Sequence, residues 1–111
     1  MSTSSKGRQG ERLAEAFLEA HGYRIVARNF RTPDGEADLI AVDGRTLVIV
    51  EVKRRDKRTF GSALAAVDNR KRRALRKIGA DFAQIAAPGA RIRFDVVAID
   101  GNRLALHRNA F

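Results

Sequence analysis

The sequence predicts an α/β fold in which a mixed β-sheet is flanked by helices. Two stretches have apolar residues at helical spacing, and five shorter stretches alternate apolar and polar residues as strands do. One of these, the run at residues 47–50, is apolar on both faces, which is typical of a central strand covered on both sides. The 111 residues suffice for a single core and show no internal repeat or linker, so residues 10–111 are expected to form one domain.

The first helix is predicted over residues 10–21, after a flexible basic tail over residues 1–9. Helical spacing gives it one apolar face, formed by Leu13, Phe17 and Ala20 with Ala14 and Leu18 beside them. Gly22 is a suitable C-terminal cap because glycine adopts the left-handed conformation without steric cost. Residues 23–29 then alternate and predict the first strand.

Two turn signals separate the next two strands. The Thr-Pro-Asp-Gly run at residues 32–35 favours a turn, and residues 36–42 follow it as a strand. The Asp-Gly pair at residues 43–44 is typical of a two-residue hairpin turn. It leads into residues 46–53, the strand that contains the apolar run 47–50.

The second half of the chain predicts one helix and two strands. Residues 54–61 are charged and contain a glycine, which favours a loop. Asp68 is a good N-cap for the second helix, and the Pro-Gly pair at residues 88–89 ends it. The buried stripe of this helix is expected to consist of Leu75, Ile78, Phe82 and Ile85. Residues 92–100 and 104–107 are the last strands, so the predicted order is α-β-β-β-α-β-β.

The charge balance predicts a polyanionic partner. The net charge is +9 and the sequence pI is about 11.2, and nucleic acid is the commonest polyanion for such a protein. Eleven of the 22 lysines and arginines lie between residues 53 and 77, among only two acids. Contacts to a phosphate backbone are therefore expected from Arg54, Arg55, Lys57, Arg58, Arg70, Lys71, Arg72 and Arg73.

Composition excludes several other classes of protein. The chain has no cysteine, which excludes disulfides, thiolate zinc sites and a cysteine nucleophile. Its two histidines, His21 and His107, have no metal-site spacing. No apolar run has the length of a membrane span and residues 1–9 do not form a secretory signal, so we expect a cytoplasmic protein without membrane association.

Three charged residues near the end of the apolar strand form the candidate site. In a strand, Glu51 and Lys53 point to the same face. Counted outward from the 43–44 turn, Ile49 faces Asp38, which makes Asp38 and Glu51 diagonal neighbours. Two carboxylates this close repel each other unless a cation lies between them, and oxygen ligands favour Mg²⁺ or Mn²⁺. A nearby ammonium can orient the attacking water in metal-assisted phosphodiester hydrolysis.

Two runs near this site resemble a known family. The sequence GEADLI at residues 35–40 and VEVK at residues 50–53 are similar to the YraN-like family of small uncharacterised bacterial proteins. Its members look like PD-(D/E)xK nucleases, particularly the archaeal Holliday-junction resolvases. The resemblance continues along almost the whole chain, at residues 10–11, 22–23, 28–29, 60–61, 71, 93–95 and 109–111.

The resemblance implies a restriction-endonuclease-like fold and assigns roles to particular residues. Asp38 and Glu51 would be metal ligands, with the carbonyl of Val52 as a further ligand. Lys53 would be the catalytic lysine. Glu11, on the first helix, matches the acid that completes the site in the resolvases.

Three functions are open on the sequence alone. The first is a Mg²⁺- or Mn²⁺-dependent DNA endonuclease acting on branched or structured DNA; a resolvase would be a homodimer, because a four-way junction needs two symmetric cuts. The second is a non-catalytic nucleic-acid-binding module on a nuclease scaffold. The third is a protein-interaction domain with a basic surface. The site residues themselves have a simpler interpretation as a cross-strand ion-pair cluster.

Overall fold

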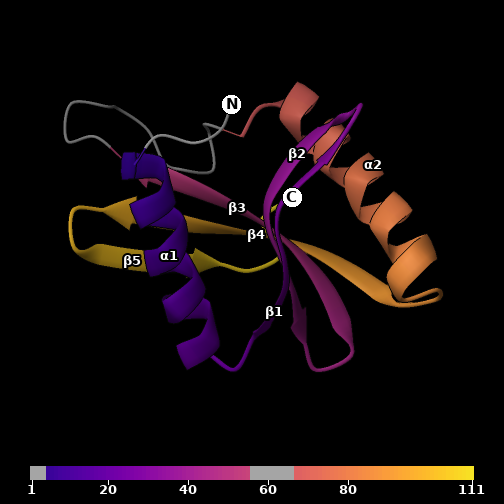
Figure 1. The fold of residues 1–111 in the computed structure, drawn as a ribbon, viewed down its shortest axis with the longest axis horizontal. Helices are drawn as coiled ribbons and strands as arrows, with labels where there is room; N and C mark the ends of the chain where they lie inside the picture. Colours follow the sequence, from indigo (N-terminus) through magenta and orange to yellow (C-terminus); the bar gives the residue numbers. More distant parts are fainter. Residues whose placement is uncertain (1–4, 56–66) are drawn as a thin grey trace.

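The computed structural model describes residues 5–55 and 67–111, and the side chains of residues 8–54 and 67–111. In these residues the helices are α1 (Ser5–Ala20) and α2 (Asn69–Ala86). The strands are β1 (Arg24–Thr32), β2 (Gly35–Asp43), β3 (Thr46–Arg55), β4 (Arg91–Asp100) and β5 (Arg103–His107). The predicted order α-β-β-β-α-β-β is confirmed, and α1 and α2 cover opposite faces of the sheet (Figure 1).

The strands form one mixed sheet in the order β1-β2-β3-β4-β5. The central pair, β3 and β4, is parallel, and the other neighbouring pairs are antiparallel. As its apolar run predicts, β3 is covered on both sides: Val48 and Val50 belong to the core under α1, whereas Leu47 and Ile49 belong to the core under α2. The α/β class with a mixed sheet is therefore confirmed.

Helix α1 begins five residues before the predicted start at Gly10, so residues 5–9 of the expected tail are helical. Lys6, Arg8 and Gln9 are good helix formers, and apolar periodicity cannot locate a helix start within a polar turn. Residues 1–4 lie outside the described part of the chain. No helix in that part is both long and apolar enough to cross a membrane.

The buried line of α1 runs through Gly10, Ala14 and Leu18. Leu13 is 46% exposed and Ala20 is exposed as well, so the predicted place of both residues on the face toward the core is wrong. The helix approaches the sheet closely at its small residues: a Cβ on Gly10 would lie 3.3 Å from Nη2 of Arg54. The small residues Gly10 and Ala14 thus permit close approach of the first part of the helix, Leu18 fills the core farther along, and Leu13 lies beside this line.

Helix α2 begins as predicted, because the Asp68 side chain accepts a 2.9 Å hydrogen bond from the backbone N–H of Lys71. Its expected stripe is only partly correct. Leu75 and Ile78 are fully buried, but Ile85 is 85% exposed. Gly79 and Ala83 also belong to the buried residues of α2, and a Cβ on Gly79 would lie 3.1 Å from Cγ1 of Ile49.

The exposure of Ile85 follows from the position of the β1–β2 hairpin, which reaches across to α2 (Figure 1). The tip of the hairpin contacts the first half of the helix, where a Cβ on Gly35 would lie 3.6 Å from Cβ of Ala74. Farther along, the rings of Phe30 and Phe82 meet edge to face at 5.2 Å. Ile85 lies almost two turns beyond Ile78 and has no such cover.

The register of β2 against β3 differs from the prediction. The two-residue turn consists of residues 44–45, so Asp43 pairs with Thr46 and Ile40 pairs with Ile49. The predicted register would have set the Asp38 carboxylate opposite Ile49, whereas the observed register pairs apolar residues with each other. If the observed register is continued one residue beyond its last pair, Leu39–Val50, the position opposite Asp38 is Glu51.

Candidate metal and nucleic-acid site

Strands β2 and β3 separate beyond the pair Leu39–Val50, and the candidate site lies at this opening. Asp38 is half-buried there, and its Oδ2 accepts a 2.8 Å hydrogen bond from the backbone N–H of Val52. The carboxylate of Asp38 thus accepts the hydrogen bond that a backbone carbonyl of β2 would accept in a regular sheet. This bond fixes the Asp38 carboxylate against the strand segment that carries Glu51.

Glu51 is a buried carboxylate with incomplete hydrogen bonding. The residue is 2% exposed, and its Oε1 is buried with no hydrogen-bond partner among the described residues. Burial and then the charge of Asp38 raise the pKa of Glu51 to about 7, although Lys71 and Lys53 lower it. A cation bound between the two acids would give the unsatisfied oxygen of Glu51 a partner and would offset the repulsion between the carboxylates.

Two ammonium groups approach the same oxygen of Glu51. Nζ of Lys53 lies 3.4 Å and Nζ of Lys71 lies 3.5 Å from Oε2. Lys53 comes from the same face of β3, and Lys71 comes from the first turn of α2, where Asp68 caps the helix. Both side chains are about one-third exposed, at 32% and 36%, so they can meet a ligand from solvent.

Glu11 approaches the site from α1, close enough to Asp38 for the charge of one carboxylate to act on the other. Burial and the charge of Asp38 raise the pKa of Glu11, and a side-chain hydrogen bond from Asn29 lowers it. In the described ranges, however, no group of three or more His, Cys, Asp or Glu side chains converges as a metal site. The acids that the structure brings together around Glu51 are therefore the pair Asp38 and Glu51.

The donor set fits a hard divalent cation. It offers carboxylate oxygens from Asp38 and Glu51, one of them unsatisfied, and neither histidine nor cysteine takes part. Mg²⁺ is commonly bound through one or two carboxylates and retains several waters, so a third acidic side chain is not needed. Oxygen donors of this kind select Mg²⁺ or Mn²⁺ over zinc.

The predicted phosphate-contacting residues fall into different environments. Arg70 and Arg73 are exposed near the start of α2, close in sequence to Lys71. Arg72 is engaged within the fold, since its Nε donates a 2.7 Å hydrogen bond to the Val67 carbonyl and its guanidinium lies 5.3 Å from the centre of the Phe111 ring.

The remaining basic candidates lie at and beyond the end of β3. Strand β3 continues through Arg55, so Arg54 and Arg55 are not in the loop that the sequence predicted. The guanidinium of Arg54 lies against Gly10 of α1. The side chain of Arg55, together with Lys57 and Arg58, lies outside the described residues.

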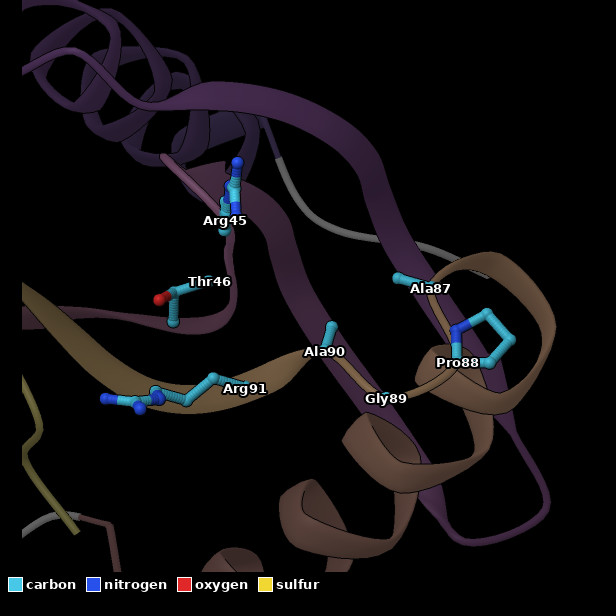
Figure 2. Close-up of a pocket in the computed structure, with 7 residues that line it drawn as sticks. All are labelled: Arg45, Thr46, Ala87, Pro88, Gly89, Ala90 and Arg91. Atoms are coloured by element: carbon cyan, nitrogen blue, oxygen red, sulfur yellow. The ribbon is translucent and has the colours of Figure 1, made fainter.

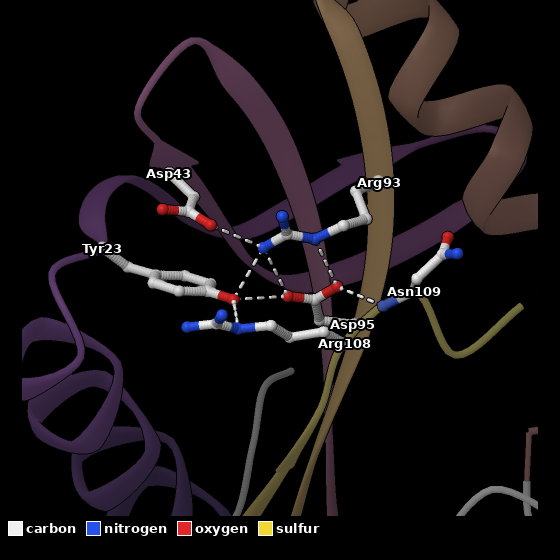
Figure 3. Close-up of polar contacts among 6 residues, drawn as sticks. All are labelled: Tyr23, Asp43, Arg93, Asp95, Arg108 and Asn109. Carbon is white, nitrogen blue, oxygen red and sulfur yellow. Dashed lines mark hydrogen bonds and ion pairs between the residues drawn. The ribbon is translucent and has the colours of Figure 1, made fainter.

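A buried polar network on the α1 face was not predicted (Figure 3). Its centre is Asp95, which is fully buried and accepts hydrogen bonds from the Tyr23 hydroxyl at 2.8 Å, Nε of Arg93 at 3.0 Å and the backbone N–H of Asn109 at 2.9 Å. The sequence did carry a signal. Asp95 lies on the same face of β4 as the buried Val97 and Ile99, and a buried acid requires hydrogen-bond partners.

Tyr23 and Arg93 extend this network to further elements. Nη2 of Arg93 donates to Oδ2 of Asp43 at 2.9 Å, and Nε of Arg108 donates to the Tyr23 hydroxyl at 3.1 Å. Burial and the hydrogen bond to Asp95 raise the pKa of Tyr23, which keeps its hydroxyl protonated as a donor. Since both oxygens of Asp95 and the Tyr23 hydroxyl are held by hydrogen bonds, we interpret the network as structural: it joins β4 to the segments before β1 and after β5.

A surface pocket of about 460 Å³ lies at the other end of β3 from Glu51 (Figure 2). It is formed by the turn between β2 and β3 and the loop between α2 and β4, with the lining residues Arg45, Thr46, Ala87, Pro88, Gly89, Ala90 and Arg91. None of the predicted site residues lines it.

Comparison with known proteins gives a consistent family. A family model described as "Uncharacterised protein family UPF0102" matches residues 10–99. A UPF0102 protein of Desulfosudis oleivorans is 46% identical over 108 residues, covering 95% of this chain and 88% of its own. One from Thermodesulfovibrio yellowstonii is 41% identical, covering 95% and 94%, and one from Halorhodospira halophila is 46% identical, covering 96% and 86%.

Proposed function

The chain belongs to the uncharacterised protein family UPF0102, and from this premise and the site between β2 and β3 we propose that the protein is a Mg²⁺- or Mn²⁺-dependent DNA endonuclease. The YraN-like resemblance of the sequence is confirmed by this membership. The observation that carries the proposal is Glu51: a buried carboxylate beside Asp38, with one oxygen unsatisfied and two lysines at the other.

In this proposal Asp38 and Glu51 hold the cation, with the Val52 carbonyl as a further ligand. The cation, when bound, supplies Lewis-acid polarisation of a phosphodiester and a lowered pKa for a coordinated water. Lys53 stabilises negative charge that develops on the phosphate or orients the attacking water. The hydrogen bond from the Val52 N–H keeps the Asp38 carboxylate in place, because its donor belongs to the backbone of β3.

The substrate is proposed from the charges around the site. Lys71 lies at Glu51, and the exposed Arg70 and Arg73 flank it in sequence at the start of α2. Such residues hold a phosphate backbone without reading its base sequence, so selectivity would come from the shape of the DNA. This favours branched or structured DNA, and cleavage of a four-way junction would require a homodimer.

Cleavage of a panel of duplex, flap and four-way-junction DNA tests the proposal. The wild-type protein should cut at least one substrate with Mn²⁺ or Mg²⁺, and a chelator should abolish the cleavage. Lys53→Ala should lower the rate by about 10²-fold, the scale seen when one charge-stabilising donor is removed. Lys77→Ala is the matched control, because Lys77 is an exposed lysine of α2 that pairs with Asp81 away from Glu51.

A non-catalytic nucleic-acid-binding module is the second candidate. The observation in its favour is that only two acids converge at Glu51 in the described part of the chain. This candidate predicts salt-dependent DNA binding that an Asp38→Ala, Glu51→Ala double variant retains, with no cleavage of any substrate in the panel. Lysine-dependent and metal-dependent cleavage would reject it.

A further inference from the structure

Asn29 has an unusual backbone for a residue within a strand. Its φ is +49°, and among the described residues the only other non-glycine residue with positive φ is Asn109, at +52°. Asparagine tolerates this left-handed conformation better than most residues do, but it still departs from the geometry of a strand. In β1 the pairs Arg28–Leu39 and Phe30–Ala37 flank Asn29, so its partner position in β2 is Asp38.

The β1–β2 hairpin changes face at this pair. Ala27 and Phe30 both pack against the core under α2, although they are three residues apart, and so do their partners Ile40 and Ala37. In a regular strand, residues three apart point to opposite faces. The left-handed residue Asn29 lies between them and accounts for the change. Beyond the Asn29–Asp38 pair, the tip of the hairpin turns onto α2. At the pair itself, Asp38 leaves the regular alternation of side chains, and its carboxylate accepts a hydrogen bond from the backbone N–H of Val52.

The side chain of Asn29 lies at the site as well. It makes the side-chain hydrogen bond to Glu11. Asn29 and Glu11 also line one small pocket of about 150 Å³, together with Leu39, the residue next to Asp38. Asn29 is exposed, so packing of the core does not explain its conformation.

We propose that Asn29 is a positioning residue of the metal site, whose left-handed backbone directs Asp38 toward β3 and whose amide holds Glu11 beside Asp38. The proposal rests on the proposed function, since it concerns the acids assigned to the cation. It gives Glu11 a defined place: Glu11 supports the site through Asp38 and Asn29 and does not need to converge with Glu51.

Asn29→Gly separates the amide from the backbone, because glycine keeps the positive φ without the side chain. Mn²⁺ affinity, measured by calorimetry, should fall about 10-fold, the lower end of the loss when an outer partner of a metal ligand is removed. Glu11→Gln should give a similar loss, and the double variant should lose no more than either single variant, because both remove the same contact. Unfolding by urea should show little change in stability for Asn29→Gly.

Asn109→Gly is the matched control, since Asn109 has the same backbone conformation and belongs to the network around Asp95, to which its backbone N–H bonds (Figure 3); Mn²⁺ affinity should stay at the wild-type value. If Asn29→Gly is destabilised, Asn29→Asp provides the second variant, because aspartate also tolerates positive φ but cannot donate to Glu11. Wild-type affinity in both Asn29 variants, or additive losses in the double variant with Glu11→Gln, would overturn the inference. If instead the wild-type protein binds no Mn²⁺, or binds it unchanged after Asp38→Ala, the proposed function itself fails.

Discussion

Replacement of Glu51 by glutamine should change how the stability of the protein depends on pH. The folded-state pKa of Glu51 is about 7, raised from an ordinary value of 4.5. Because the folded state binds this proton more tightly than the unfolded chain does, its contribution to stability is complete below pH 4.5. That contribution is then lost as the pH rises through 7.

The size of the loss follows from the two pKa values. Linkage gives a decrease of about 2 kcal/mol in the free energy of unfolding of the metal-free wild-type protein between roughly pH 5.5 and pH 8. Glu51→Gln has no proton to lose at this position and should not show that decrease. A divalent cation should restore stability to the wild-type protein at the higher pH, since binding to the folded state stabilises it, but should not restore it to Glu51→Gln.

Urea titrations followed by circular dichroism, with chelator and with Mg²⁺, measure these free energies. Glu19→Gln is the control, because it removes an exposed carboxylate of α1 and leaves Glu51 intact. Its pH dependence should match that of the wild-type protein. The same pH dependence in Glu51→Gln as in the wild-type protein would refute the reasoning, because it would mean that Glu51 titrates in the folded protein as it does in the unfolded chain.

Three further predictions concern the fold. Tyr23→Phe should lower the free energy of unfolding by about 1–3 kcal/mol in urea titrations, because buried Asp95 loses a donor; an unchanged value would show that the network adds nothing. Gly79→Ala should destabilise by about 1–3 kcal/mol through crowding of Ile49 at 3.1 Å, despite the better helix propensity of alanine, and a rise in melting temperature would contradict the close approach. Ile78→Ala should cost about 2–5 kcal/mol and Ile85→Ala less than about 0.5 kcal/mol, since Ile78 is buried and Ile85 is 85% exposed; equal losses would argue for the stripe predicted from the sequence.

The elements of the fold could be predicted from the sequence because their signals are local. The apolar run at residues 47–50 identifies the covered central strand, and Asp68 identifies the start of α2. Ile85 could not be placed in this way. Helical periodicity gives the direction of its side chain, but its exposure depends on where the β1–β2 hairpin ends, which is a long-range property.

The candidate site was predicted less completely. Asp38 and Glu51 could be associated by counting along two strands from the turn that joins them. The predicted register of these strands was nevertheless wrong by two residues, because both Asp-Gly and Gly-Arg can form a two-residue turn. Side-chain pairing between strands decided the register. The second lysine at Glu51 depends on how α2 packs against the sheet, so the sequence indicated that Lys71 was basic and near a helix start but not that it lies 3.5 Å from Glu51.

The parallel pairing of β3 with β4 has a consequence for the order of folding. Strands β1, β2 and β3 are joined by short turns and can form early, whereas β4 must close a loop of more than 30 residues to reach β3. Asp38 and Glu51 both belong to the early meander, so their carboxylates meet before Lys71 arrives with α2. At neutral pH Lys53 is the ammonium of the meander that offsets their repulsion at the end of β3, and docking of α2 adds Lys71 as a second one.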